Sequence, residues 1–152
     1  NRNRSFNPQT VFFLDMKIPA NRYRFFVYDI GTKKILHRGL VAQGINTQPD
    51  ARGRLRFSNE TGSYCTSLGR YRIGQKYKGR FGTAYKLHGL DSSNSNAYRR
   101  AIVLHKFDDM PDTPGGETVY SLGCPMVSPQ FFTTVSRLID QSEAPILLQI
   151  SY

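Results

Sequence analysis

Short apolar and aromatic segments, each followed by turn-forming residues, run through most of this sequence. Gly, Pro, Asp and Asn interrupt the chain so often that no apolar run exceeds a few residues. Short segments rich in β-branched and aromatic side chains are typical of strands. We therefore predict strands at Val11–Ile18, Tyr23–Ile30, Ile35–Gln43, Gly69–Gln75, Thr83–Leu90, Ala101–Leu104 and Ile146–Ile150. A membrane-spanning helix needs ~20 apolar residues, so insertion into a membrane is not expected.

One helix is predicted, near the C-terminus. Ser128 can accept hydrogen bonds from the first free amides of a helix, and Pro129 suits the first helical position. The apolar residues that follow at helical spacing are Phe132, Val135, Leu138 and Ile139. Pro145 prevents the helix from continuing into the last predicted strand. Many strands and a single helix indicate a mainly β domain, either a sandwich or a partly closed barrel.

The chain is expected to form one domain, because its 152 residues contain no internal repeat and no linker. The first ten residues are polar and lack a strand pattern. We therefore predict a flexible N-terminal arm over 1–10 and a folded domain over 11–152. The segment Asn1–Arg4 is too polar for a signal peptide, so in an exported protein that signal has been removed.

The basic charge is concentrated in the first two thirds of the chain. Residues 1–100 contain 19 of the 21 Lys and Arg side chains but only 5 of the 11 Asp and Glu side chains. This balance favours an anionic partner, for which nucleic acid, anionic lipid and an acidic cell-wall polymer all qualify. The segment Arg70–Lys86 interleaves cations with aromatic rings, as single-strand nucleic-acid binders do. Two strands with a solvated basic face explain the segment more simply, so we do not expect a nucleic-acid partner.

An apolar strand that ends in a histidine is followed, after a gap of fifteen residues, by the S-L-G-C segment. A nucleophilic thiol such as that of Cys124 needs a base, and the imidazole of His105 could take its proton. Gly123 allows a tight bend, so amides near Gly123 and Cys124 could stabilise an oxyanion. Ser121 could orient the imidazole or a substrate carbonyl. These four residues are candidates for an acyl-transfer site.

Plainer interpretations of the same residues are also open. A cysteine in a strand is often a small core residue, and a histidine at a strand end often has only a structural role. Cys65 and Cys124 could also form a disulfide. We expect no metal site, because the chain has no C-x-x-C and two cysteines alone cannot hold zinc. His37 and His88 have no neighbouring cysteine or acid, so both are expected to be structural.

The combined pattern resembles the catalytic domain of murein L,D-transpeptidases, in a YkuD-like sub-branch with S-x-G-C-P. The resemblance covers roughly residues 11–152 and rests on R-F-F-V-Y-D-I-G-T-K-K-I-L at 24–36, S-L-G-R-Y-R-I-G at 67–74, Y-K-L-H-G-L at 85–90, R-A-I-V-L-H at 100–105 and S-L-G-C-P at 121–125. It implies a β-sandwich with long loops, no cofactor, and a location outside the cytoplasmic membrane. It also implies that Cys124 is the nucleophile, that His105 is the base, and that backbone near Gly123 and Cys124 binds the oxyanion.

The resemblance implies an enzyme that acts on peptidoglycan stem peptides and is a target of carbapenems. A thioester on Cys124 would pass to an amine in an L,D-transpeptidase and to water in an L,D-carboxypeptidase. A catalytically dead, basic wall-binding module is the third alternative. Arg100, directly before the strand with the histidine, and Tyr64 are further candidates for substrate binding, although packing of Arg100 with an acid would be more usual. We expect a monomer.

Two positions depart from the better-known branch of this family. Lys106 follows the histidine where that branch often has Gly, and Met126 stands two places past the cysteine where that branch usually has Arg. No basic residue lies between Cys124 and Arg137. The substrate contact associated with that Arg therefore cannot be assigned to the same position here.

Overall fold

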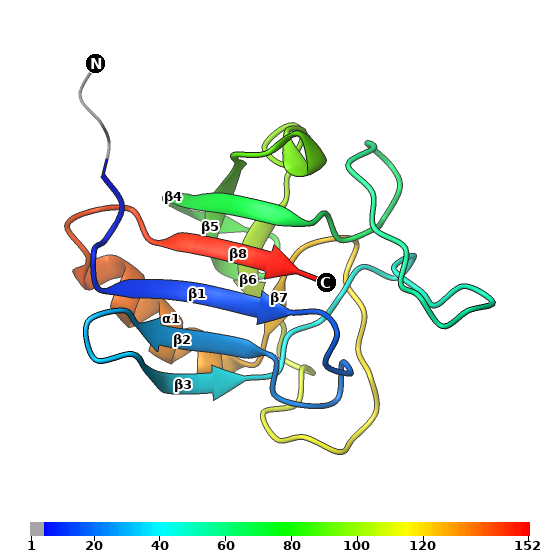
Figure 1. The fold of residues 1–152 in the computed structure, drawn as a ribbon, viewed down its shortest axis with the longest axis horizontal. Helices are drawn as coiled ribbons and strands as arrows, with labels where there is room; N and C mark the ends of the chain where they lie inside the picture. Colours follow the sequence, from blue (N-terminus) through cyan, green and yellow to red (C-terminus); the bar gives the residue numbers. More distant parts are fainter. Residues whose placement is uncertain (1–4) are drawn as a thin grey trace.

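The computed structural model describes residues 5–152, which form eight β-strands, one α-helix and one turn of 3-10 helix (Figure 1). In chain order the elements are β1 (Thr10–Asp15), β2 (Phe25–Asp29), β3 (Lys34–Gly39), β4 (Gly69–Gly79), β5 (Gly82–Gly89), η1 (Ser92–Asn94), β6 (Val103–Lys106), β7 (Met126–Val127), α1 (Pro129–Gln141) and β8 (Leu147–Ser151). The prediction of a mainly β domain with one helix near the C-terminus is confirmed. The sequence pattern does not predict β7 and η1, because each has only two or three residues.

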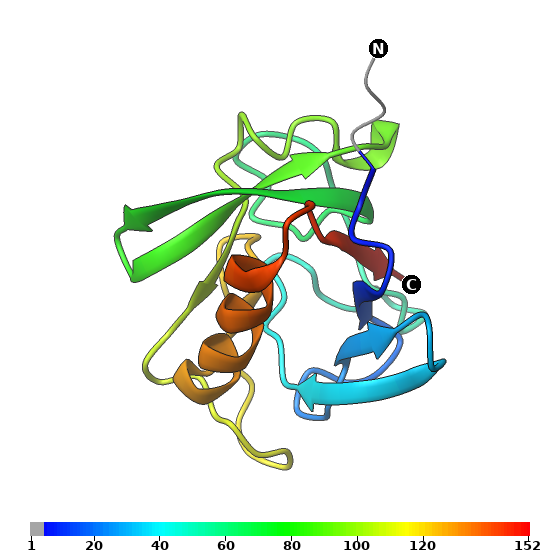
Figure 2. The ribbon, with the colours of Figure 1, turned by 90° about the vertical axis from the view of Figure 1, so that its left-hand side faces the viewer.

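All eight strands belong to one curved sheet with the order β3-β2-β1-β8-β4-β5-β6-β7. Neighbouring strands are antiparallel except in the pairs β1/β8 and β6/β7. The sheet folds around α1, which lies between β1–β3 on one side and β4–β5 on the other (Figure 2). A bridge between Ala42, just past β3, and Met126 in β7 joins the two ends of the sheet. The molecule thus combines the facing layers of a sandwich with the closure of a partial barrel.

The helix α1 fills the space that the curved sheet encloses. Ser128 caps it by accepting a hydrogen bond from the Phe131 amide at 3.1 Å, as the sequence predicts. The Phe131 ring meets Phe25 of β2 edge-on at a centroid distance of 5.0 Å, and the Phe132 ring lies 6.0 Å from that of Tyr85 in β5. One helix therefore contacts both halves of the sheet and holds them at a fixed separation.

A fully buried arginine, Arg24, precedes β2. Its Nε and Nη2 donate to the carbonyl oxygen of Val41 at 3.0 and 2.7 Å, and Nη1 donates to Gln43 Oε1 at 3.1 Å. Burial lowers the pKa of Arg24 to about 10, so the guanidinium stays charged at neutral pH. These bonds fix Val41 and Gln43 in the segment after β3. Gly44, which follows Gln43, forms an isolated β-bridge with Ser121.

The expected N-terminal arm differs from the structure in part. Residues 1–4 of the arm lie outside the described residues. The amide of Asn7 donates to the carbonyl oxygen of Pro145 at 2.8 Å, and β1 begins at Thr10. Residues 7–10 therefore belong to the folded domain, because they pair with groups far away in the sequence.

Several predicted strands have other bounds in the structure. The first strand ends at Asp15 and not at Ile18, and β4 continues to Gly79. Two further differences lie close to β6 and β7. The strand expected at Ala101–Leu104 begins at Val103, because Ala101 has a φ of +57°, outside the extended region. The strand expected to reach Gln43 ends at Gly39, where the chain crosses from β3 toward β7.

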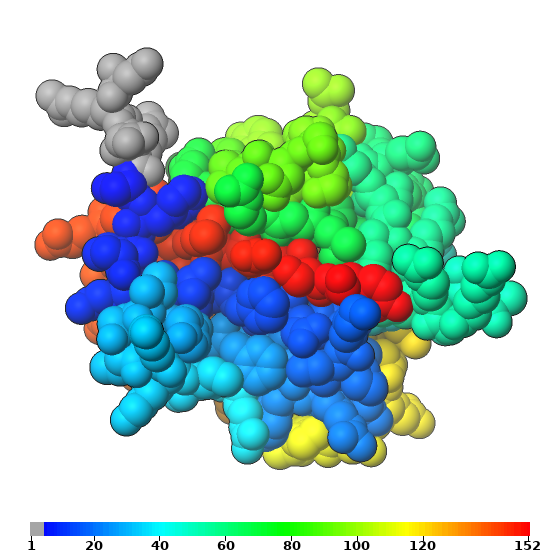
Figure 3. Space-filling view, in the orientation of Figure 1, coloured from blue at the N-terminus to red at the C-terminus, as the bar shows by residue number. Residues whose placement is uncertain are grey.

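Two long loops approach the same side of β6. Residues 40–68, between β3 and β4, include a part that projects beyond the body of the molecule (Figure 1, Figure 3). Residues 107–125, between β6 and β7, include the acidic segment Asp108–Glu117. Within residues 5–152, no helix is long and apolar enough to cross a membrane.

Candidate active site

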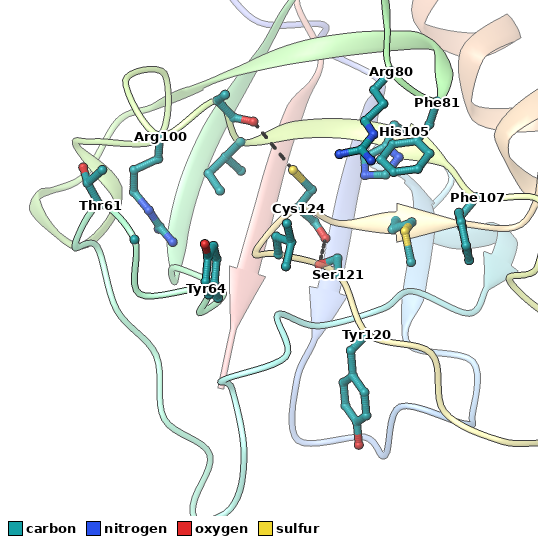
Figure 4. Close-up of a pocket in the computed structure, with 15 residues that line it drawn as sticks. Thr61, Tyr64, Arg80, Phe81, Arg100, His105, Phe107, Tyr120, Ser121 and Cys124 are labelled. Atoms are coloured by element: carbon teal, nitrogen blue, oxygen red, sulfur yellow. Dashed lines mark hydrogen bonds between the residues drawn. The ribbon is translucent and has the colours of Figure 1, made fainter.

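A pocket of about 460 Å³ opens where the two long loops meet the tip of the β4–β5 hairpin (Figure 4). Five of the residues predicted for the site line it, namely Tyr64, Arg100, His105, Ser121 and Cys124. The other lining residues are Thr61, Gly62, Arg80, Phe81, Ala101, Ile102, Phe107, Tyr120, Leu122 and Met126. The fold thus brings residues that are far apart in the sequence into one cavity.

The turn that presents Cys124 is held by its own hydrogen bonds. The Ser121 hydroxyl donates to the carbonyl oxygen of Cys124 at 2.6 Å and accepts from the Gly123 amide at 3.1 Å. Gly123 has a φ of +122°, and a Cβ at this position would lie 2.9 Å from the carbonyl oxygen of Cys65. Only glycine fits both the backbone conformation and the space.

These bonds bear on two expectations about the turn. Ser121 holds the turn and, among the described residues, makes no hydrogen bond with His105, so orientation of a substrate carbonyl is the role that stays a prediction. The Gly123 amide already donates to Ser121, so it is not free for an oxyanion. No described residue accepts a hydrogen bond from the Cys124 amide, which leaves that amide available.

The Cys124 thiol lies between two backbone groups of the segment that leads into β6. Its Sγ accepts from the Val103 amide at 3.4 Å and donates to the carbonyl oxygen of Ala101 at 3.6 Å. Burial raises the pKa of Cys124, and the Val103 amide and the charge of Arg100 offset this only in part. The resting group at neutral pH is therefore a protonated thiol.

His105 enters the pocket from β6 with one ring nitrogen already bonded. Nδ1 lies 2.9 Å from the carbonyl oxygen of Lys106, which can only accept, so Nδ1 carries the proton and Nε2 carries the lone pair. Burial lowers the pKa of His105, with the Lys106 carbonyl acting in the opposite direction. The imidazole is thus neutral at pH 7, in the tautomer that a general base requires. Among the described residues no hydrogen bond joins His105 and Cys124.

Arg100 holds the part of the loop between β3 and β4 that lies next to the pocket. Nη1 donates to the carbonyl oxygen of Ser58 at 3.0 Å, and Nη2 donates to Ser63 Oγ at 3.1 Å and to the carbonyl oxygen of Cys65 at 2.8 Å. Its partners are neutral oxygens and not the acid that is usual for arginine. Tyr64, within this loop, has a φ of +55° and an exposed ring at the pocket. Arg100 therefore holds the loop that carries Tyr64 beside the Cys124 turn.

The two cysteines are both free thiols, so the disulfide alternative is not realised. Cys65 is fully buried, and its Sγ approaches the carbonyl oxygen of Ser63 at 3.7 Å. Cys124 is the cysteine that lines the pocket.

The residues that sequence reasoning missed come mainly from the hairpin tip. The ring of Phe81 stacks on His105 at a centroid distance of 5.1 Å with an interplanar angle of 15°, and it meets Phe107 edge-on. Arg80 stands next to Phe81 in the same turn. Glycines on both sides of Arg80-Phe81 signal a turn in the sequence, but nothing there indicates which strand end this turn covers.

The remaining histidines and basic residues lie outside the pocket. His37 is in β3, and His88, in β5, stacks on Tyr98 at 5.1 Å. In the basic segment, Arg70 pairs with Asp91 at 2.6 Å and Lys76 pairs with Asp140 at 2.9 Å. Residues 5–152 hold no group of three or more His, Cys, Asp and Glu side chains placed to bind a metal ion.

Comparison with known proteins agrees with this fold. A family model described as the L,D-transpeptidase catalytic domain matches residues 1–147. A search among curated proteins gives no match. Solved structures with a similar fold include an L,D-transpeptidase from Xylanimonas cellulosilytica, with 14% identity and a TM-score of 0.51 over 97% of this chain and 62% of that one.

Two further structures are similar to this chain. The L,D-transpeptidase LdtMt1 in complex with imipenem has 13% identity and a TM-score of 0.55 over 94% of this chain and 59% of that one. The helical cell shape determining protein Pgp2 from Campylobacter jejuni has 11% identity and a TM-score of 0.57 over 94% of this chain and 47% of that one. The chain thus spans between about half and three fifths of the length of these structures. The family model covers nearly all of the chain, and the chain belongs to the L,D-transpeptidase catalytic domain family.

Proposed function

We propose that this chain is an L,D-transpeptidase that joins peptidoglycan stem peptides through a thioester on Cys124. The observation that supports this most strongly is the shared pocket of the Cys124 thiol and the His105 imidazole. Membership of the family supports the reaction class and the substrate class. The basic charge of residues 1–100 suits a wall polymer that carries carboxylates, and a location outside the cytoplasmic membrane is part of the proposal.

In the first half of the reaction, His105 acts as the general base. Because Nδ1 is bonded to Lys106, Nε2 is the nitrogen that takes the thiol proton. Rotation of the Cys124 side chain away from the Ala101 carbonyl directs that proton toward the imidazole. The sulfur forms a bond with the carbonyl carbon at the L-centre of the stem peptide, and the C–N bond to the terminal D-amino acid breaks. The imidazolium returns its proton to the leaving amine.

In the second half, an acceptor amine attacks the thioester. His105 takes a proton from this amine, the C–S bond breaks, and the thiolate of Cys124 recovers a proton from the imidazolium. The negative oxygen of both tetrahedral intermediates needs hydrogen-bond donors, and we assign the Cys124 amide to this role because the Gly123 amide is occupied. Water in place of the amine would make the same acyl-enzyme a carboxypeptidase.

The test is incubation with purified tetrapeptide muropeptides, with the products analysed by mass. A cross-linked dimer together with the released D-amino acid supports transpeptidation. A tripeptide without any dimer identifies a carboxypeptidase, and unchanged substrate identifies a wall-binding module without activity. The Cys124→Ala variant is the control for contaminating enzymes. A structural relative binds imipenem, so we also propose that a carbapenem acylates Cys124.

A further inference from the structure

The turn at the tip of the β4–β5 hairpin packs against the imidazole of His105. The two strands stay paired as far as Gly82, so Arg80 and Phe81 form a two-residue turn. Gly82 has a φ of +92°, a conformation that glycine adopts without strain. Ala84 of β5 is aligned with His105 of β6, and this register carries the turn past the end of β6 and over the pocket.

Arg80 lines the pocket and makes a cation–π contact with its neighbour Phe81. Its guanidinium carbon lies 5.7 Å from the centre of the Phe81 ring, and that ring lies parallel to His105. Arg80 lines the same cavity as His105 and Cys124 (Figure 4). A cation–π contact leaves the N–H groups of the guanidinium free to bind a ligand.

Two arginine side chains line the pocket, and only one of them is bonded to other described residues. No Asp or Glu among residues 5–152 lines the cavity, whereas Arg80 and Arg100 both do. Arg100 is occupied by three protein oxygens. Arg80 makes no hydrogen bond or ion pair with any residue in the described part of the chain, and its guanidinium contacts the Phe81 ring. A ligand with negative charge would meet attraction from Arg80 and no repulsion from the cavity wall.

We propose that Arg80 binds a carboxylate of the acyl donor and so determines which substrates react with Cys124. The planar guanidinium offers paired N–H groups that match the two oxygens of a carboxylate. The identity of the donor rests on the proposed function, but the preference for a carboxylate does not. Two carboxylates of a stem peptide have this chemistry, the terminal one of the leaving D-amino acid and one on a side chain of the stem.

The charge preference can be measured without any peptidoglycan substrate. Iodoacetate and iodoacetamide both alkylate a thiolate, with formation of an S–C bond and loss of iodide, and they differ only in carboxylate against amide. The measured quantity is the ratio of their rate constants at Cys124, located by peptide mass. Arg80→Gln should lower the iodoacetate-to-iodoacetamide ratio by roughly three- to tenfold, the range for a charged hydrogen bond at a partly exposed site.

Two further variants separate a specific contact from general charge. Arg80→Lys should keep most of the ratio, because the positive charge remains. Lys78→Gln removes a charge from an exposed position of the same hairpin that does not line the pocket, and it should leave the ratio nearly unchanged. An unchanged ratio in Arg80→Gln, an equal loss with both reagents, or an equal drop in Lys78→Gln would overturn the proposal.

Stem peptides then show which carboxylate is bound. Acylation of Cys124 is compared for tetrapeptides with a free or amidated C-terminus, and with a free or amidated side-chain carboxylate. Arg80→Gln should abolish the preference for the free acid at one of these positions, which is then the bound carboxylate. A preference that persists at both positions in Arg80→Gln contradicts the proposal while leaving the proposed function intact. If no peptide acylates Cys124, the proposed function fails, and the alkylation ratio still decides the role of Arg80.

Discussion

Burial acts in opposite directions on the pKa values of the two groups that we propose to react in the pocket. It raises the pKa of the Cys124 thiol and lowers the pKa of the His105 imidazole. Both groups are therefore uncharged at neutral pH. A neutral thiol beside a neutral imidazole suits general-base catalysis, in which the proton moves during the attack, and does not suit a preformed thiolate–imidazolium pair.

The neutral resting pair predicts how alkylation depends on pH. The rate at Cys124 with iodoacetamide should keep rising above neutral pH, because burial raises the pKa of the thiol above its ordinary value and the thiolate forms only as the pH approaches that pKa. Rates measured by mass from about pH 5 to about pH 10 test this. High, constant reactivity on the acidic side of neutrality would reveal a thiolate–imidazolium pair and contradict the assignment.

Removal of the His105 imidazole should slow the acylation of Cys124, even though the thiol is still present. His105→Ala should slow acylation of Cys124 by a carbapenem by roughly 10²–10⁴-fold, the usual contribution of a general base. His88→Ala and His37→Ala should react at nearly the normal rate, because neither side chain lines the pocket. Thermal unfolding of each variant confirms that it is folded. A large loss in His88→Ala together with normal acylation of His105→Ala would refute His105 as the base.

Individual elements of the fold position the site from opposite sides. The β4–β5 hairpin covers the imidazole through Phe81, and the Arg100-bound loop flanks the Cys124 turn. The helix α1 supports both arrangements indirectly, because it keeps the two halves of the sheet apart. Changes in these elements should therefore affect the geometry of the pocket or the stability of the sheet.

The aromatic stack predicts that Phe81 positions His105. Phe81→Ala should reduce the acylation rate by about tenfold, since a loosened base loses alignment. The pKa of His105 should also rise toward its ordinary value, because the burial that lowers it is reduced. The low-pH limb of the acylation profile measures this shift. Phe81→Tyr keeps the stack and should behave like the native protein, whereas an unchanged rate and profile in Phe81→Ala would refute the positioning role.

The close contact between β3 and α1 predicts that a side chain added at Gly39 destabilises the protein. A Cβ at Gly39 would lie 2.6 Å from the Phe131 ring, so Gly39→Ala should lower the free energy of unfolding by about 1–3 kcal/mol. Gly116→Ala is the matched control, because its Cβ would meet nothing within 4 Å. Denaturant unfolding compares the two variants. Equal stability of Gly39→Ala and Gly116→Ala would show that α1 can move away from β3 at no cost.

At the scale of the whole molecule, local patterns predict the elements well but not their arrangement. The spacing of apolar residues and the cap at Ser128 identify α1, and segments rich in β-branched and aromatic residues identify most strands. The parallel pairing of β1 with β8, between the two ends of the chain, depends on distant contacts that no local pattern encodes.

The candidate site shows the same division between local and distant information. Cys124 and His105 are visible in the sequence, because a strand and a small-residue turn are local features. The part of Phe81 and Arg80 in the pocket follows from the register of Ala84 with His105, which only the folded sheet defines. The hydrogen bonds of Ser121 lie within the turn and leave no signal in residue type, so the sequence does not predict that Ser121 holds the turn.

The central claim is that Cys124 carries the acyl group, and intact-mass spectrometry of the protein tests it most directly. After brief incubation with a stem tetrapeptide and rapid acid quenching, the native protein should gain the mass of the peptide minus its terminal D-amino acid. Peptide mapping should place this mass on Cys124, and Cys124→Ala should remain unmodified with little change in thermal unfolding. An adduct that persists in Cys124→Ala, or turnover of the tetrapeptide by that variant, would contradict the account.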